Sequence, residues 1–129
     1  MEKDTIIKLN KRFEEYAYEQ DGVEYWLARE LQELLGYTEW RNFLNAINKA
    51  KESCETTGNA VSDHFVDVNK TIQMPKGATK EVPDFILTRY ACYLIAQNGD
   101  PKKEQIAFAQ SYFAIQTRKQ ELLEERILL

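Results

Sequence analysis

Hydrophobic side chains recur at helical spacing along most of this chain, and the densest such pattern lies in residues 89–99. Leu94, Ile95 and Ala96 lie on its strongly apolar side, and few positions around the helix are plainly polar. The pattern predicts a helix that is buried on most sides. Thr88 precedes it, and we expect its side chain to cap the first free backbone N–H groups.

The end of that helix carries signals for a tight corner. We expect Gly99 to adopt the left-handed conformation that ends many helices, and Asp100-Pro101 to cap and begin the next helix. No helix breaker follows, so the pattern predicts one long helix to Leu129, about 43 Å in length. Four apolar residues near its end are expected to pair with the same helix of a second copy, in a homodimer, or with a later part of a longer protein. They are Leu122, Leu123, Ile127 and Leu128.

The front of the chain predicts one helix and one hairpin. Apolar residues recur at helical spacing over residues 4–16, with charged residues between them, so this helix is amphipathic. Asp21-Gly22 is a typical turn pair, and Tyr25-Trp26 behind it suits a short strand. We therefore expect a small hairpin that begins near Ala17.

Two further helices are predicted after the hairpin. Residues 28–35 have the spacing of a short helix, which Gly36 ends. Thr38 is then expected to cap a second helix over residues 39–55. Two helices joined by a short glycine-containing turn have the spacing of a DNA-reading helix-turn-helix. Plain packing of two helices at a corner has the same spacing, so both interpretations stay open.

The spacing changes to alternation in residues 66–74, which predicts a strand. Residues 75–78 are a turn signal, and residues 79–87 are expected to return as a second strand that Pro83 confines to an edge or a bulge. A hairpin with a basic tip after a helix pair resembles the wing of winged DNA-binding proteins, whose tip lies along phosphates.

The composition fits a folded domain, since 43% of the 129 residues are hydrophobic and 12% are aromatic. We expect one α+β domain over residues 1–129, mostly helical, with the helix-turn-helix-like pair, a small antiparallel hairpin or sheet and the long carboxyl-terminal helix. The apolar carboxyl end predicts that it is the amino-terminal part of a longer protein. No apolar run is long enough for a membrane span and no signal peptide is recognisable, so we expect a cytoplasmic protein that binds no membrane.

The residues that usually carry catalysis or bind metal are scarce. His64 is the single histidine, and Cys54 and Cys92 have no cysteine or histidine at ligand spacing, so we expect no catalytic residue, metal or cofactor. We interpret His64 as a half-buried structural residue and the cysteines as buried thiols. Asp84 and Glu81 lie near Lys80, but their order differs from the acid-x-lysine strand that is usual in nuclease-like metal sites. We interpret them as residues of a solvated hairpin.

The formal net charge of −4 is not spread evenly along the chain. Residues 1–38 hold nine acids and five bases, whereas residues 39–129 hold twelve of each. Two windows, residues 40–51 and 68–80, contain bases and no acid. Solvated faces explain each window most simply, but together they lie where a winged protein contacts DNA. The candidate DNA-binding residues are Arg41, Asn45, Lys49, Lys51, Lys70, Lys76 and Lys80.

Three stretches resemble a known family, and they read WLARELQELLGYTEWRNFLNAINKAKESCETTG, VSDHFVDVNK and LTRYACYLIAQNGDPKKEQIAFAQSYFAIQTRKQEL. They are similar to the amino-terminal region of the DNA-damage-inducible protein D family of bacteria and phages, over about residues 13–126. The string RYACYLIAQNGDP is highly specific for that family. The shorter piece ARELQELLGY also resembles the start of the amino-terminal domain of BRO-type phage antirepressors.

The resemblance implies an α+β domain, a place in the SOS response to DNA damage and action on DNA transactions, including recombinase filaments, without catalysis. It assigns no functional residues. Two functions therefore stay open. Either the domain binds DNA through residues 39–51 and the hairpin tip, or it is a protein-interaction module whose acidic front binds a recombinase or another repair protein.

Overall fold

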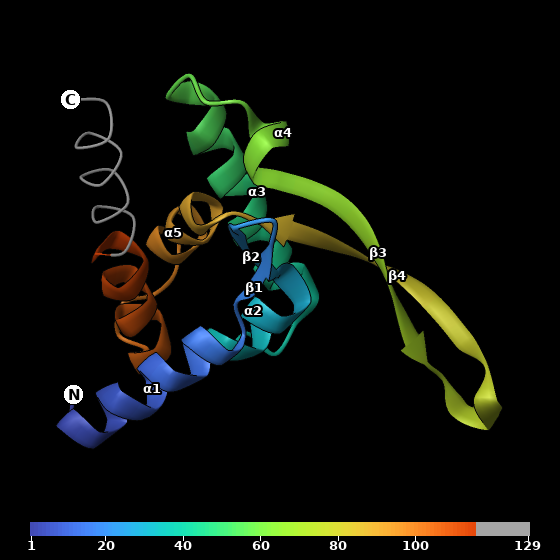
Figure 1. The fold of residues 1–129 in the computed structure, drawn as a ribbon, viewed down its shortest axis with the longest axis horizontal. Coiled ribbons are helices and arrows are strands. Elements are labelled where there is room, and N and C mark those ends of the chain that lie inside the picture. The colour runs from blue at the N-terminus through green and yellow to red at the C-terminus, as the bar shows by residue number, and fades with distance from the viewer. Residues whose placement is uncertain (116–129) are drawn as a thin grey trace.

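The computed structural model describes residues 1–115, which form an α+β fold (Figure 1). Helices form a body around one end of an antiparallel four-stranded sheet, and two strands continue from it as a long arm (Figure 1). The predicted α+β class is confirmed. The elements in chain order are α1 (Lys3–Glu15), β1 (Tyr18–Gln20), β2 (Val23–Leu27), α2 (Ala28–Leu34), α3 (Trp40–Thr56), α4 (Val61–His64), β3 (Phe65–Gln73), η1 (Pro75–Gly77), β4 (Thr79–Leu87), α5 (Arg89–Gln97) and the helical residues 104–115.

The first helix and the hairpin after it form as the sequence predicts. α1 buries Leu9 and Phe13 and exposes its charged residues. β1 and β2 pair antiparallel, and the turn between them places Asp21 at φ 54° and Gly22 at φ 79°. Positive φ at both central residues is typical of the turn that matches the right-handed twist of hairpin strands. The Asp21-Gly22 pair therefore closes the hairpin.

α5 lies at the centre of the described core and contacts α3, β2 and β4. The Thr88 side chain accepts a hydrogen bond from the Ala91 N–H at 3.2 Å, so the predicted cap is confirmed. Leu94 is only half-buried, and Ile95 occupies the deeper position. The residues that α5 buries are Ala91, Cys92, Ile95 and Ala96.

Two predicted helix starts are wrong. α3 begins at Trp40 with Glu39 in the N-cap position, so Thr38 lies outside the cap. Residues 101–103 form a turn and a bend, and the next helix begins only at residue 104. The Asp100 carboxylate accepts a hydrogen bond from the Lys102 N–H at 3.0 Å, which holds the turn and delays the helix.

The helical residues 104–115 pack on α1 through aromatic rings. The ring of Phe13 lies 5.1–5.8 Å, between centroids, from those of Phe108, Tyr112 and Phe113. This cluster joins the first and last described helices. The rest of the predicted long helix, with the proposed interface residues Leu122, Leu123, Ile127 and Leu128, lies outside the described residues. The homodimer stays a prediction.

Gly99 is needed at its corner for a reason other than the predicted one. Its φ is not positive, so the left-handed conformation is wrong. A Cβ atom at this position would lie 2.7 Å from Cγ2 and 3.0 Å from Cδ1 of Ile106. Carbon atoms do not pack that closely. The missing side chain therefore lets α5 approach the helical residues 104–115.

Gly99→Ala should lower the free energy of unfolding by about 1–3 kcal/mol, because the new methyl group overpacks against Ile106. Urea denaturation measures this loss. Ile106→Ala removes both contacting atoms, so Gly99→Ala should cost much less in that background. If Gly99→Ala lowers the free energy of unfolding equally in the wild type and in Ile106→Ala, the contact with Ile106 is not the reason that glycine is needed at position 99.

The sheet order is β1-β2-β4-β3. β4 pairs with β3 from Thr79 to Leu87, but with β2 only at Ile86 and Leu87. Pro83 therefore lies where the second edge of β4 is free, and its missing N–H interrupts no ladder with β2. The predicted edge position of Pro83 is confirmed.

Candidate nucleic-acid interface

The arm formed by β3 and β4 stands clear of the body beyond its base (Figure 1). The base is buried through Phe65, Asp84, Phe85 and Leu87. From the Asn69–Pro83 pair to the turn, every residue is exposed or half-buried. This free part contains five residue pairs, a length of about 16 Å. Both of its edges are unpaired within residues 1–115.

Two lysines share one face of this free part. Lys80 pairs with Ile72, which lies two residues from Lys70 along β3. Opposite residues, and residues two apart on a strand, point to the same face. Glu81 lies next to Lys80 and therefore points to the other face. The lysine face is free of acids between residues 69 and 83, and we call Lys70, Lys80 and Lys76 at the turn the arm lysines.

A short turn closes the arm. Residues 75–77 form one turn of 3₁₀ helix, in which Lys76 has φ 68° and Gly77 has φ 78°. The Met74 N–H donates a hydrogen bond to the Ala78 carbonyl at 2.8 Å, which pins the two strands together. This turn, which contains Lys76, forms the outer end of the arm and lies away from the body (Figure 1).

A stack of aromatic and cationic groups fixes the base of the arm to the helix pair. The Arg29 guanidinium lies 3.9 Å from the centroid of the Trp40 ring. The Trp40 ring stacks on the Phe85 ring, with 6.3 Å between the two centroids. The Lys51 ammonium lies 4.4 Å from the centroid of the Phe85 ring. Cations over aromatic faces are attracted by the ring quadrupole. We call Arg29, Trp40, Phe85 and Lys51 the base stack, after the base of the arm. No sequence pattern predicted it, because its members are distant in the chain.

Asp84 ties the arm to α2. Its carboxylate is 2% exposed and accepts hydrogen bonds from the backbone N–H groups of Arg29 at 2.9 Å and Phe85 at 2.8 Å. Arg29 lies in the first turn of α2, whose N-cap residue Leu27 makes no side-chain cap. A strand carboxylate therefore satisfies a free N–H of the helix. The predicted solvated position of Asp84 is wrong. The sequence signal for its burial is that it is the single charged residue in the otherwise apolar run 82–87.

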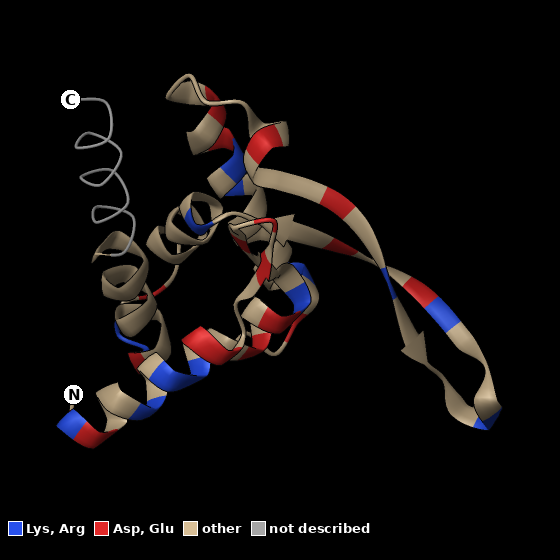
Figure 2. Ribbon diagram, viewed as in Figure 1, with Lys and Arg blue, Asp and Glu red and all other residues tan. Residues whose placement is uncertain are grey.

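The candidate residues of α3 form a second, separate group. Arg41, Asn45 and Lys49 are exposed and recur every four residues, so they line one side of the helix. Lys51 is half-buried against Phe85 and takes part in the base stack. Because the arm projects away from α3 (Figure 2), the structure does not bring the seven predicted residues into one cluster. Their role in DNA binding stays a prediction.

Acidic residues gather at the end of α1, on the β1–β2 hairpin and on α2, and we call this region the acidic front (Figure 2). Arg89 forms an ion pair with Glu24, in which its Nε donates at 2.8 Å. The Tyr18 hydroxyl donates to Glu30 at 3.0 Å, and this hydrogen bond raises the pKa of the phenol. Glu14 contributes to a polar pocket of about 320 Å³ in the same region. The acidic front thus lies on the body, and the arm lysines lie beyond it.

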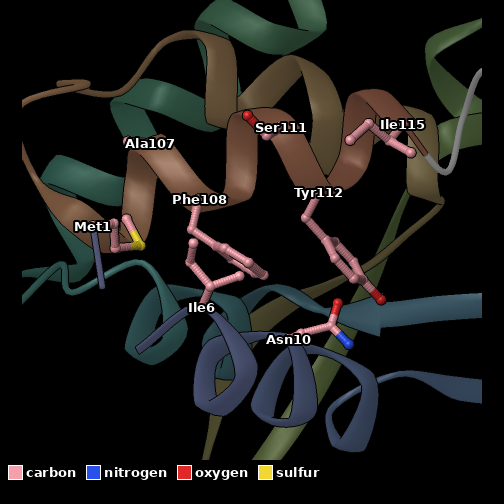
Figure 3. Close-up of a pocket in the computed structure, with 8 residues that line it drawn as sticks. All are labelled: Met1, Ile6, Asn10, Ala107, Phe108, Ser111, Tyr112 and Ile115. Carbon is pink, nitrogen blue, oxygen red and sulfur yellow. The ribbon is translucent and has the colours of Figure 1, made fainter. Parts of the chain in front are cut away.

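A groove of about 530 Å³ lies between α1 and the helical residues 104–115. Figure 3 shows the residues that line it. Ile6, Phe108 and Ile115 contribute much of its apolar lining, and none of the side chains from residues 1–115 that line it is charged. Ile6 is 42% exposed and Ile115 is 55% exposed. The groove therefore offers mainly apolar surface.

The groups that could carry other chemistry are held in structural positions. His64 is half-buried, with its Nδ1 2.7 Å from the Thr88 hydroxyl and its ring against Tyr90. Cys54 and Cys92 are buried free thiols, as predicted, and burial raises the pKa of Cys92 well above its ordinary value. Within residues 1–115, no group of three or more His, Cys, Asp or Glu side chains is placed to hold a metal ion. No helix in that range is long and apolar enough to cross a membrane.

The sequence of this fold matches a known protein family over most of its length. The family model described as the BRO family, N-terminal domain, matches residues 15–114, which include the helix pair, the whole arm and α5. The chain belongs to the BRO family. Most of α1 precedes the matched BRO domain, although Phe13 packs into its core.

A curated relative of this BRO chain is DNA damage-inducible protein D of Escherichia coli (strain K12). The two are 48% identical over 105 residues, which are 81% of this chain and 38% of the relative. The chain therefore spans well under half of that relative's length. No solved structure matches the chain.

Proposed function

We propose that this BRO domain binds DNA through the arm lysines and takes part in the response to DNA damage without catalysing a reaction. The free arm carries the proposal, because its three exposed lysines lie on an acid-free face and at the tip, clear of the acidic front. Lysine binds phosphate as a point charge, and such contacts supply affinity without reading sequence. The name of the relative, DNA damage-inducible protein D, supports the place in the damage response.

The exposed side of α3 is the proposed second contact. Arg41 and Asn45 are side chains of the types that pair with base edges, and both are exposed one turn apart. Asp84 and the base stack fasten the helix pair to the root of the arm. The root of the arm therefore keeps one fixed orientation relative to α3. Action on recombinase filaments belongs to the same proposal, since such filaments contain DNA.

Replacing Lys70, Lys76 and Lys80 together with glutamine should weaken DNA binding roughly tenfold or more, since each phosphate contact that is lost also loses its counterion release. The slope of log K against log salt should become shallower by up to about 2.7 for three contacts on duplex DNA. Fluorescence anisotropy with labelled duplex and single-stranded DNA, between about 50 and 200 mM salt, measures both quantities.

Three lysines of α1 provide a matched control with the same change of charge. Lys3, Lys8 and Lys11 are exposed on α1, so their triple glutamine variant also loses three positive charges. This control should bind DNA nearly as the wild type does. Equal weakening in both triple variants would show a general charge effect and would contradict binding through the arm.

A second candidate function is supported by the acidic front itself. Its acidic residues gather on one region of the body (Figure 2). Glu14 and Glu19 line a polar pocket there. Such a surface is complementary to a basic patch of a recombinase or another repair protein. If the wild-type chain binds neither duplex nor single-stranded DNA at about 50 mM salt, the DNA proposal fails and this protein-interaction function is favoured.

A further inference from the structure

The tip of the arm exposes apolar atoms where the arm lysines end. Met74 is 39% exposed, and Pro75 and Ala78 beside it are exposed too. The hydrogen bond from Met74 to Ala78 and the fixed φ of proline keep this apolar tip in one shape. The tip therefore loses little conformational entropy when it binds a partner. The tip is a rigid apolar wedge with Lys76 at its apex.

The free part of the lysine face has few groups that could read bases by hydrogen bonds. Apart from Lys70 and Lys80 it presents Ile72 and Val82, which have no polar side-chain atoms. Met74 and Pro75 at the tip also offer no side-chain N–H or hydroxyl group. These residue types suit contact with sugars and base faces, whereas base-edge recognition needs donors and acceptors.

The opposite face of the free part is polar, but its charge is unfavourable for DNA. It presents Asn69, Thr71 and Gln73, which are side chains that could bond to base edges. It also presents Glu81 and no basic residue between residues 69 and 83. A face with a net negative charge is repelled from a groove that is walled by phosphates. Charge therefore favours an approach by the tip and the lysine face.

We propose, on the basis of the DNA-binding function above, that Met74 and Pro75 insert as a wedge between base pairs of a duplex. Apolar wedges of this kind enter from the minor groove, partly unstack a base step and bend the duplex, while flanking lysines neutralise nearby phosphates. Unstacking costs a few kcal/mol and is cheapest where the duplex is already mismatched or interrupted. The preferred ligand is therefore duplex DNA with a mismatch or a nick, rather than intact duplex.

The test compares one duplex sequence in intact, mismatched and nicked forms. The wild-type chain should prefer the mismatched or nicked form roughly tenfold, and energy transfer between dyes at the duplex ends should report a bend. Met74→Gln with Pro75→Ser should abolish the preference and the bend. The salt slope should not change, because the arm lysines remain. Both residues are exposed, so the urea midpoint should also stay unchanged, which checks the fold of the variant.

Val66→Thr is the matched control, since Val66 is 42% exposed at the base of the same strand. It should bind and bend DNA as the wild type does. Lysine-dependent binding without bending or preference would overturn the wedge and leave the DNA-binding function intact. Bending that survives in the tip variant would also overturn it. A wild type that binds no DNA at all would instead refute the proposed function, and the wedge with it.

Discussion

Replacing Phe13 with alanine should lower the free energy of unfolding by about 3–5 kcal/mol, measured by urea denaturation followed by circular dichroism. Phe13 is fully buried, and its ring packs against Phe108, Tyr112 and Phe113. The substitution loses the burial of an aromatic ring and leaves a cavity. α1 cannot fill that cavity, because Leu9 is the only other residue that it buries.

Ile7→Ala is the control, because Ile7 lies on the same helix and is 57% exposed. It should change the free energy of unfolding by less than about 0.5 kcal/mol. A loss of that small size for Phe13→Ala as well would show that α1 is not part of the cooperative core. The cooperative folding unit would then begin near residue 15, where the match to the BRO family begins, and would leave out most of α1.

Asp84→Ala should lower the free energy of unfolding by about 2–4 kcal/mol, because two hydrogen bonds to a buried carboxylate are lost. The N–H groups of Arg29 and Phe85 would be left without acceptors. Denaturation measures the total effect. Amide hydrogen exchange measures its location, since these two amides should lose protection more than their neighbours do.

Asp67→Ala is the matched control, since Asp67 is an exposed acid of the same arm. It should change the free energy of unfolding by no more than about 0.5 kcal/mol. Asp84→Asn keeps one acceptor oxygen and should fall between the wild type and Asp84→Ala. If Asp84→Ala is as stable as Asp67→Ala, the link between arm and α2 contributes nothing to stability.

Features that depend on neighbours in sequence were predictable from the sequence. The helical spacing of residues 4–16 and 89–99 predicts α1 and α5, and the alternation in residues 66–74 predicts β3. Asp21-Gly22 and Thr88 act within one turn of the backbone, so their roles follow from residue type and position. The exposure of the arm lysines was also readable, because a charge in an alternating pattern near a turn has no core to enter.

Features that depend on contacts between distant segments were decided only by the tertiary structure. Gly99 looks like a helix terminator, yet the side chain of Ile106 makes it necessary. Asp84 looks like a surface acid, yet it accepts a hydrogen bond from Arg29, which is 55 residues away. Thr38 and Asp100 show the same limit, because both are good caps that the folded chain does not use to begin a helix.

The candidate interface is divided in the same way. The sequence by itself determined that residues 40–51 and 68–80 carry bases without acids, but it could not determine whether the two windows meet. The structure separates them, because β4 pairs with β2 over only two residues and the rest of the arm leaves the body. Alternation of side chains is the same in a buried hairpin and in a free arm, since it reports the pleat of a strand and not the neighbours that cover it.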